Sequence, residues 1–303
     1  MTSPKAITFI TADHDKGRHA VNIFRGRYDV AKLDEDEAQR FNDAAPELKQ
    51  LLDAFIAKVR VPQDFSKEEV KAAYGYPNGH IKVAVPQQIA MLIEVFPGLV
   101  GTQALELAKR LPKDLPTHSE QWLALPKIEA IGRLFFAEIE DEAERYCAAV
   151  NLVLDKIAES RAFTNWRSGQ ITKDRLRQRA KDKEMLAVVE ASQPGDIVII
   201  EAQLGKRHGG RSVRRARAVF LGNEFGLGAF HVGCVVLTHP KRLQKWEELD
   251  MDCPGDEFDE TDSDDRFDRA PFFHCDGGEV KFDTFVVSGA RDGCGSVSGF
   301  PPQ

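Results

Sequence analysis

The sequence predicts an α+β protein, with a mainly helical N-terminal domain followed by a β-rich C-terminal domain. Two observations support this prediction. Apolar residues recur at the helical interval over the first part of the chain, whereas β-branched runs and glycines dominate after about residue 191. We therefore expect a domain over residues 1–191, with a small N-terminal β-hairpin and one long central helix. A second domain over residues 192–303 is expected to form a small barrel or a bent sheet.

The composition is that of a folded, water-soluble protein. Of the 303 residues, 42% are hydrophobic and 29% are charged, which is ordinary for globular domains. No apolar stretch approaches the ~20 residues of a membrane span, and no secretory signal follows the N-terminus. The five cysteines are an odd number, which argues against a disulfide framework. We therefore expect a cytoplasmic protein with free thiols and no membrane partner.

The first domain begins with two strand candidates, at residues 6–11 and 21–24, on either side of a polar turn. Acidic residues at 34–37 then open a helix, because they complement the positive end of its dipole. Another helix runs from Pro46 to about Arg60, with apolar residues three and four positions apart. Further helices are expected at about 87–96 and 101–111.

Residues 126–160 carry the clearest helical periodicity of the chain. Apolar side chains from Ile128 to Ile157 are separated on average by about 3.6 residues, which is the α-helical repeat. We expect one helix over this range, continuous or with a single kink, and Ile139 on its buried face. A basic helix is expected next, from about Thr172 to Val189.

After residue 191, a Pro-Gly turn leads into an apolar run at 197–200 that is typical of a strand buried on both faces. Glycines and basic residues indicate a long basic loop over 205–217. Strands are expected at 219–221 and 229–237, and an acidic loop at 247–268. Short strands at 272–273, 280–282 and 285–287 complete the domain.

Charge is distributed very unevenly along the chain. Residues 161–217 contain 14 Lys and Arg against 6 Asp and Glu, whereas residues 247–268 contain 1 against 12. Clustered Arg and Lys attract phosphate backbones, so we expect segment 173–217 to bind a nucleic acid or another acidic partner. The predicted polyanion-binding residues are Lys173, Arg175, Arg177, Arg179, Arg207, His208, Arg211, Arg214 and Arg215.

The acidic segment 247–268 has three interpretations. It can be a solvated loop, an internal counter-charge that lies over the basic loop, or a calcium site. The last is disfavoured because 262–265 lacks the glycine and the terminal glutamate of an EF-hand loop.

Two other functional hypotheses remain open. One is an enzyme whose site in the C-terminal domain comprises His208, His231, His274 and Asp276. The other is an inhibitor or adaptor whose acidic loop mimics a polyanion. The sequence contains no cofactor motif, and its Cys and His residues lack the close pairs of a structural zinc site. We therefore expect no cofactor and no metal; the oligomeric state does not follow from the sequence.

Overall fold

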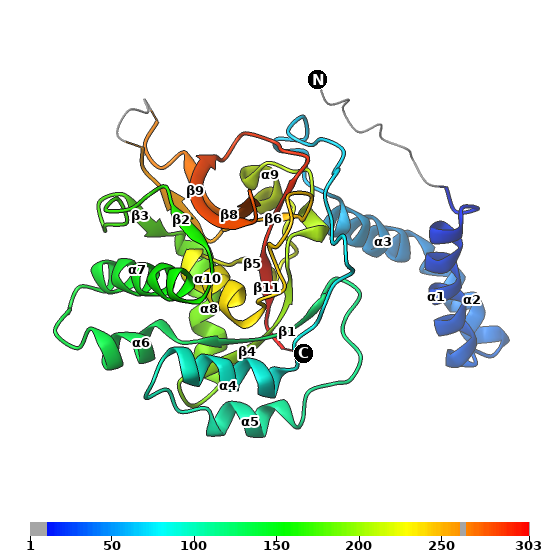
Figure 1. Ribbon diagram of the computed structural model, residues 1–303. Helices are drawn as coiled ribbons and strands as arrows, with labels where there is room; N and C mark the ends of the chain where they lie inside the picture. Colours follow the sequence, from blue (N-terminus) through cyan, green and yellow to red (C-terminus); the bar gives the residue numbers. More distant parts are fainter. Residues whose placement is uncertain (1–10, 261–264, 303) are drawn as a thin grey trace. The chain divides into compact units, whose positions relative to one another are not determined.

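The computed structural model describes residues 11–260 and 265–302 and confirms an α+β fold with a β-rich C-terminal half (Figure 1). No closed barrel is formed by these residues. The chain divides into two compact units, an N-terminal helical unit (Lys5–Gln63) and a main unit that contains Asp64–Gln303. The predicted boundary near residue 191 lies inside the main unit, where strands from both sides of it share one sheet.

The N-terminal helical unit comprises α1 (Asp15–Ala31), α2 (Glu35–Asp43) and α3 (Ala45–Val59). The strand predicted at 21–24 is wrong, because these residues belong to α1, where Phe24 and Tyr28 pack against Phe41. Residues 6–10 of the other predicted strand lie outside the described residues. The acidic start of α2 is confirmed: Asp34 and Glu37 form a capping box. The helix predicted from Pro46 is α3.

The main unit contains a four-stranded antiparallel sheet. Its order is β1 (Gln121–Pro126), β4 (Ile197–Gln203), β11 (Ser298–Phe300) and β5 (Phe225–Gly226). Every residue of β4 is buried, as its apolar run predicts. The helices predicted at 87–96 and 101–111 are α4 (Val85–Val95) and α5 (Thr102–Ala108).

The predicted long helix over 126–160 is two helices, α6 (Ile128–Phe135) and α7 (Glu142–Ser160). Asp141 starts the second helix, because its side chain accepts a hydrogen bond from Glu144 N at 2.8 Å. The Arg145 guanidinium stabilises the turn between them by donating a hydrogen bond to the Ile139 carbonyl at 2.7 Å. Gly132 leaves room for the Arg145 side chain, because a Cβ on Gly132 would lie 2.2 Å from it. The helical periodicity is continuous across this break, so the pattern alone does not reveal it.

The strand predicted at 229–237 is also wrong, because these residues form α10 (Ala229–Thr238), in which all ten residues are buried. Figure 1 shows α10 near the middle of the main unit, and it packs on α7, α4, β1 and β8 (Arg269–Asp276). Gly233 allows the contact with α7, since a Cβ there would lie 2.3 Å from Val153. A short apolar run does not distinguish a strand from a helix that is buried on every side.

The second sheet has seven strands. They are β8, β10 (Cys294–Ser296), β6 (Asp250–Asp252), β7 (Asp256–Phe258), β3 (Leu176–Gln178), β9 (Glu279–Val286) and β2 (Phe163–Asn165). The predicted closing strands at 272–273 and 280–282 lie within β8 and β9, whereas 285–287 begins in β9 and extends beyond it. The basic helix starts later than predicted, as α8 (Ala180–Ser192), because 176–178 pairs with β7.

Candidate functional site

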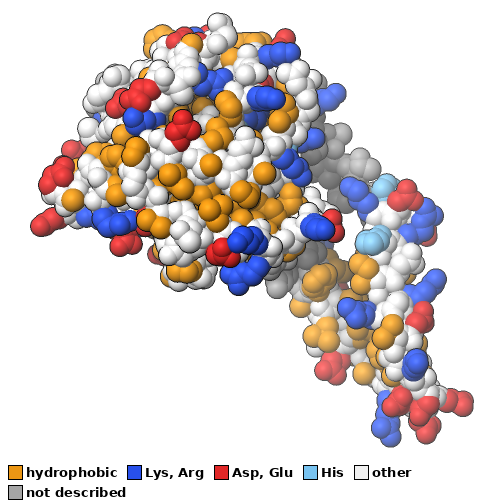
Figure 2. Space-filling model, turned by 60° about the horizontal axis from the view of Figure 1, so that its bottom comes forward, with side chains coloured by type: hydrophobic (Ala, Val, Ile, Leu, Met, Phe, Trp, Pro, Cys, Tyr) orange, Lys and Arg blue, Asp and Glu red, His pale blue; other side chains and the backbone are white. Residues whose placement is uncertain are grey.

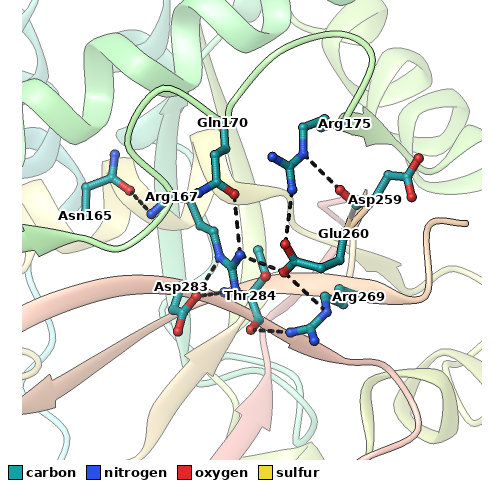
Figure 3. Close-up of polar contacts among 9 residues, drawn as sticks. All are labelled: Asn165, Arg167, Gln170, Arg175, Asp259, Glu260, Arg269, Asp283 and Thr284. Carbon is teal, nitrogen blue, oxygen red and sulfur yellow. Dashed lines mark hydrogen bonds and ion pairs between the residues drawn. The ribbon is translucent and has the colours of Figure 1, made fainter. Parts of the chain in front are cut away.

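The basic residues of 173–179 are paired with acidic side chains of the same unit. Figure 3 shows Glu260 between Arg167, Arg175 and Arg269, and the Arg175–Glu260 distance is 3.2 Å. Nearby, Arg177 pairs with Glu257 at 2.7 Å. Two further ion pairs complete the set, Lys173 with Glu144 at 3.1 Å and Arg179 with Asp182 at 2.7 Å.

These contacts decide between the interpretations of the acidic segment. Residues 247–268 are only partly a loop, since they contain β6 and β7. Glu257 and Glu260 supply an internal counter-charge through ion pairs with 167–177. Within the predicted basic loop 205–217, Arg217 donates to the backbone carbonyls of Pro254 and Asp256. Residues 261–264 lie outside the described residues.

The predicted basic loop is folded rather than presented to solvent. Residues 205–217 contain a 3-10 turn, η1 (Lys206–His208), and most of helix α9 (Val213–Ala218). The strand predicted at 219–221 does not form, and Val219 caps α9.

Segment 64–69 forms ion pairs with three of the six Lys and Arg residues of this folded loop. Arg214 pairs with Glu68, Arg215 with Glu69 at 2.6 Å, and Arg211 with Glu69 at 3.4 Å. The remaining two predicted residues meet Glu224: His208 at 2.7 Å and Arg207 at 3.6 Å.

The nine predicted polyanion-binding residues thus form two sets with different acidic partners. Such pairing lowers the charge that a phosphate backbone would meet. On the face of the main unit in Figure 2, Lys and Arg side chains are scattered among other residues and do not form one field.

Two of the four residues of the enzyme hypothesis, His274 and Asp276, influence each other's pKa, and both lie near Lys281 on β9. His208 is buried, and burial lowers its pKa. Burial also lowers the pKa of His231 inside α10, to about 4. Asp276 pairs with Lys281 at 2.7 Å, and His274 stacks on Phe272 with ring centroids 4.9 Å apart.

A cavity elsewhere in the main unit is the strongest candidate site. Its volume is about 190 Å³, and it lies between the turn at 76–83, α4, the C-terminal end of α10 and residues 240–248. The side chains that define its chemistry are Tyr76, Asn78, Ile81, Lys82, Val83, Met91, Thr238, His239, Lys241, Arg242 and Glu248. We call it the His239 cavity.

Two local turns place these residues. Gly79 adopts a φ of 75°, and its N–H donates to the Tyr76 carbonyl at 2.9 Å, so the chain turns back toward α4. At the other wall, α10 ends at Thr238, and the Pro240 that follows cannot continue the helix. Arg242 N donates to the His239 carbonyl at 2.8 Å, which closes the turn after the helix.

The charged side chains of the His239 cavity favour a negative ligand. Glu248 is the one carboxylate among the described residues that line it, and Arg242 already donates to that carboxylate. Lys82 and Lys241 are exposed at the rim and add two positive charges. Arg242 is 4% exposed, lies over the Tyr76 ring at 4.7 Å, and keeps a buried Nε without a hydrogen-bond partner among the described residues.

His239 is neutral and has a fixed tautomer. Its Nδ1 lies 3.1 Å from the Val235 carbonyl, which can only accept, so Nδ1 carries the proton. Its Nε2 therefore accepts from the Gln121 amide at 2.8 Å. Burial lowers the pKa of His239 to about 4, and the positive charge of Arg242 acts in the same direction. Near neutral pH the His239 side chain is therefore a neutral polar part of the cavity lining and adds no positive charge to it.

A buried polar layer lies behind the cavity wall. Tyr76 donates to Glu120 at 3.0 Å, and the ring centroids of Tyr76 and His80 are 5.1 Å apart. Both ring nitrogens of His80 and the Oε1 of Gln121 are buried without a hydrogen-bond partner among the described residues. A buried polar atom without a partner costs about 1–3 kcal/mol, and such atoms are uncommon away from functional sites.

Sequence reasoning missed this cavity, because its residues come from two distant segments, 76–91 and 238–248. The turn signal Pro77-Asn78-Gly79 and the helix end at Pro240 are visible in the sequence, but their proximity is not. Among the residues that the structure describes, no helix is long and apolar enough to cross a membrane, and no His, Cys, Asp or Glu group is placed to hold a metal ion. Comparisons with protein-family models, curated proteins and solved structures give no match, so the cavity is interpreted from its own chemistry.

Proposed function

We propose that this protein binds a small organic anion, a carboxylate with a short apolar body, in the His239 cavity. The observation that carries this proposal is the charge of the lining: Lys82 and Lys241 have no acidic counterpart in the cavity, because Glu248 is already paired with Arg242. Amine and guanidinium donors favour an acceptor such as a carboxylate.

The apolar part of the ligand follows from the apolar residues of the lining. Ile81, Val83 and Met91 line the cavity together with Tyr76 and contain no charged group. Apolar surface contributes about 25 cal/mol for each Å² removed from water, so an alkyl or aryl body would add affinity. A volume of about 190 Å³ admits a small molecule and excludes a folded polymer.

The proposal differs from the polyanion hypothesis in its ligand and in its site. A nucleic acid would contact the surface of segment 173–217, whereas the small anion would contact Lys82 and Lys241 in a cavity. The polyanion hypothesis stays a prediction, and the ion pairs of its nine residues weigh against it.

A titration with matched ligands tests the proposal. Hexanoate and hexanamide have nearly the same shape but differ in charge, so calorimetry on the full chain separates the two contributions. We expect hexanoate to bind at least about tenfold more tightly than hexanamide.

The double variant Lys82→Met, Lys241→Met keeps the aliphatic stems and removes both charges. We expect it to lose the preference for hexanoate, whereas Lys113→Met, at an exposed lysine outside the cavity, should retain it. Equal affinity for the two ligands, or an unchanged preference in the double variant, would overturn the proposal.

A further inference from the structure

A second cleft of about 330 Å³ lies elsewhere in the main unit and has the opposite charge. It is lined by Tyr74, Trp246, Asp250, His274, Asp292 and Cys294, among others. Residues 74–76 lie between this cleft and the His239 cavity, because Tyr74 lines the cleft and Tyr76 lines the cavity. We call it the Trp246 cleft. His274 is the one residue of the predicted enzyme site that lines either space.

The strand register brings polar side chains of the cleft together. Asp250 on β6 is the Cα partner of Cys294 on β10, and the Cys294 thiol donates to Asp250 Oδ2 at 3.3 Å. On the other side of β6, Met251 pairs with Phe273 of β8, so the next position along brings Asp250 opposite His274. The Asp250 residue therefore lies on the central strand of three, between Cys294 on β10 and His274 on β8.

The cation nearest to these carboxylates is already engaged. Arg291 donates to Asp252 at 3.0 Å, and its guanidinium lies between the rings of Phe272 and Phe285, at 4.1 and 4.2 Å. His274 supplies no charge near neutral pH, because burial lowers its pKa and the positive charges of Arg291 and Lys281 lower it further. Arg291 also lines the cleft and favours the charged form of Asp250, but its hydrogen bond is made to Asp252, so the described lining carries two carboxylates, Asp250 and Asp292, against one cation.

Two aromatic side chains form the rest of the wall. Tyr74 and Trp246 meet edge to face, with centroids 6.5 Å apart and planes at 68°. The Tyr74 ring rests on the backbone at Gly293, where a Cβ would lie 2.9 Å from it, so its position is fixed by packing. Trp246 is 56% exposed, which is a large apolar surface to leave in water beside a cleft.

We propose that the Trp246 cleft binds an organic cation, an alkylated ammonium group that lies against Trp246 and Tyr74 and is paired with Asp250 and Asp292. Aromatic faces attract cations through the ring quadrupole, most strongly at Trp, and quaternary ammonium ions are recognised in this way. The carboxylates supply the counter-charge. This inference rests on residues other than those of the proposed anion site, so either can fail without the other.

The cleft also predicts how affinity depends on pH. Burial raises the pKa of Asp250 to about 7, although the Cys294 thiol and Arg291 favour its charged form. The other charged or titratable groups around it are Asp252, Arg242, Tyr74, His274 and Asp292. Because the cation prefers an ionised carboxylate, its affinity should rise between pH 6 and pH 8.

Choline and its neutral carbon isostere 3,3-dimethyl-1-butanol test the inference with the full chain. We expect choline to bind at pH 8 at least about tenfold more tightly than the isostere, and more weakly at pH 6. Equal affinity for the two compounds, or no binding of choline at tens of millimolar, would overturn it.

Variants locate the binding. Trp246→Ala and Asp292→Asn should each weaken choline binding at least about fivefold, while Trp166→Ala, at a tryptophan that is 57% exposed outside the cleft, should leave it unchanged. Far-UV circular dichroism that matches the parent establishes that each variant is folded. A folded Trp246→Ala protein with parental affinity would contradict the assignment.

Discussion

The buried carboxylate of Asp256 makes a quantitative prediction about the stability of the main unit. Asp256 is fully buried, and its Oδ2 accepts from the first N–H of α10, Ala229 N, at 2.7 Å. The Tyr146 hydroxyl donates to the same carboxylate at 2.7 Å. Burial raises the pKa of Asp256 to about 7, and these hydrogen bonds only partly oppose that effect. The substitution Asp256→Asn retains an oxygen for Ala229 and removes the charge.

The sign of the effect follows from the two pKa values. The ordinary value is 3.8 and the folded value about 7, so the folded protein holds this proton over a pH interval in which the unfolded chain has released it. Stability from this group is fully present below pH 3.8 and falls as pH rises to about 7. At about 1.4 kcal/mol per pH unit, the loss over this interval is about 4 kcal/mol.

Denaturant unfolding at several pH values measures this contribution. All three tryptophans lie in the main unit, so their fluorescence reports its unfolding. The unfolding free energy of Asp256→Asn minus that of the parent should increase by about 4 kcal/mol between pH 4 and pH 8. As a control, Asp276→Asn should show no such increase over this interval, because the hydrogen bond from Lys281 lowers the pKa of Asp276 and places its titration below pH 4. A difference for Asp256→Asn that does not change with pH would refute the reasoning.

Three further perturbations test the packing and the charge pairs. Val153→Ala should cost about 2–3 kcal/mol in denaturant unfolding, since it removes two buried methyl groups from the contact of α7 with α10; parental stability would contradict this packing. Gly295→Ala should lower the melting temperature, because its Cβ would lie 2.1 Å from the Gly205 carbonyl, whereas Gly222→Ala has open space and should not. Replacing Arg211, Arg214 and Arg215 with Ala should also lower the melting temperature, because it breaks ion pairs to Glu68 and Glu69. If segment 173–217 binds a polyanion, the same triple variant should reduce the slope of log affinity against log salt concentration, measured with DNA or RNA, by up to about three. If the parent protein binds neither nucleic acid at low salt, the nucleic-acid hypothesis is excluded.

The sequence predicts those elements whose cause is local. The capping box of α2 and the buried run of β4 can be read directly, because helix capping and strand burial depend on neighbouring residues. The break before α7 could not be read, since the apolar positions stay in phase across it and only the cap at Asp141 marks the restart. The packing of α10 on α7 brings Gly233 against Val153, a contact between residues 80 positions apart that the local sequence does not reveal.

The candidate sites depend on long-range contacts still more. The count of basic residues in 161–217 is a property of the sequence, but their pairing with Glu68, Glu224 and Glu260 is a property of the fold. Likewise, Lys82 and Lys241 are ordinary surface residues until the structure places them at one cavity. Charge composition led to the prediction of a polyanion site at 173–217, whereas the ion pairs of these residues became visible only in the structure.

The most direct test of the proposed anion site is a crystal structure of the full chain with 6-bromohexanoate. The anomalous signal of bromine locates the apolar end of the ligand without reference to the protein. The proposal predicts one bromine against Ile81, Val83 and Met91, with the carboxylate within hydrogen-bond distance of Lys82 or Lys241. A bromine site elsewhere, with the His239 cavity free of the ligand under conditions where calorimetry shows binding, would contradict it.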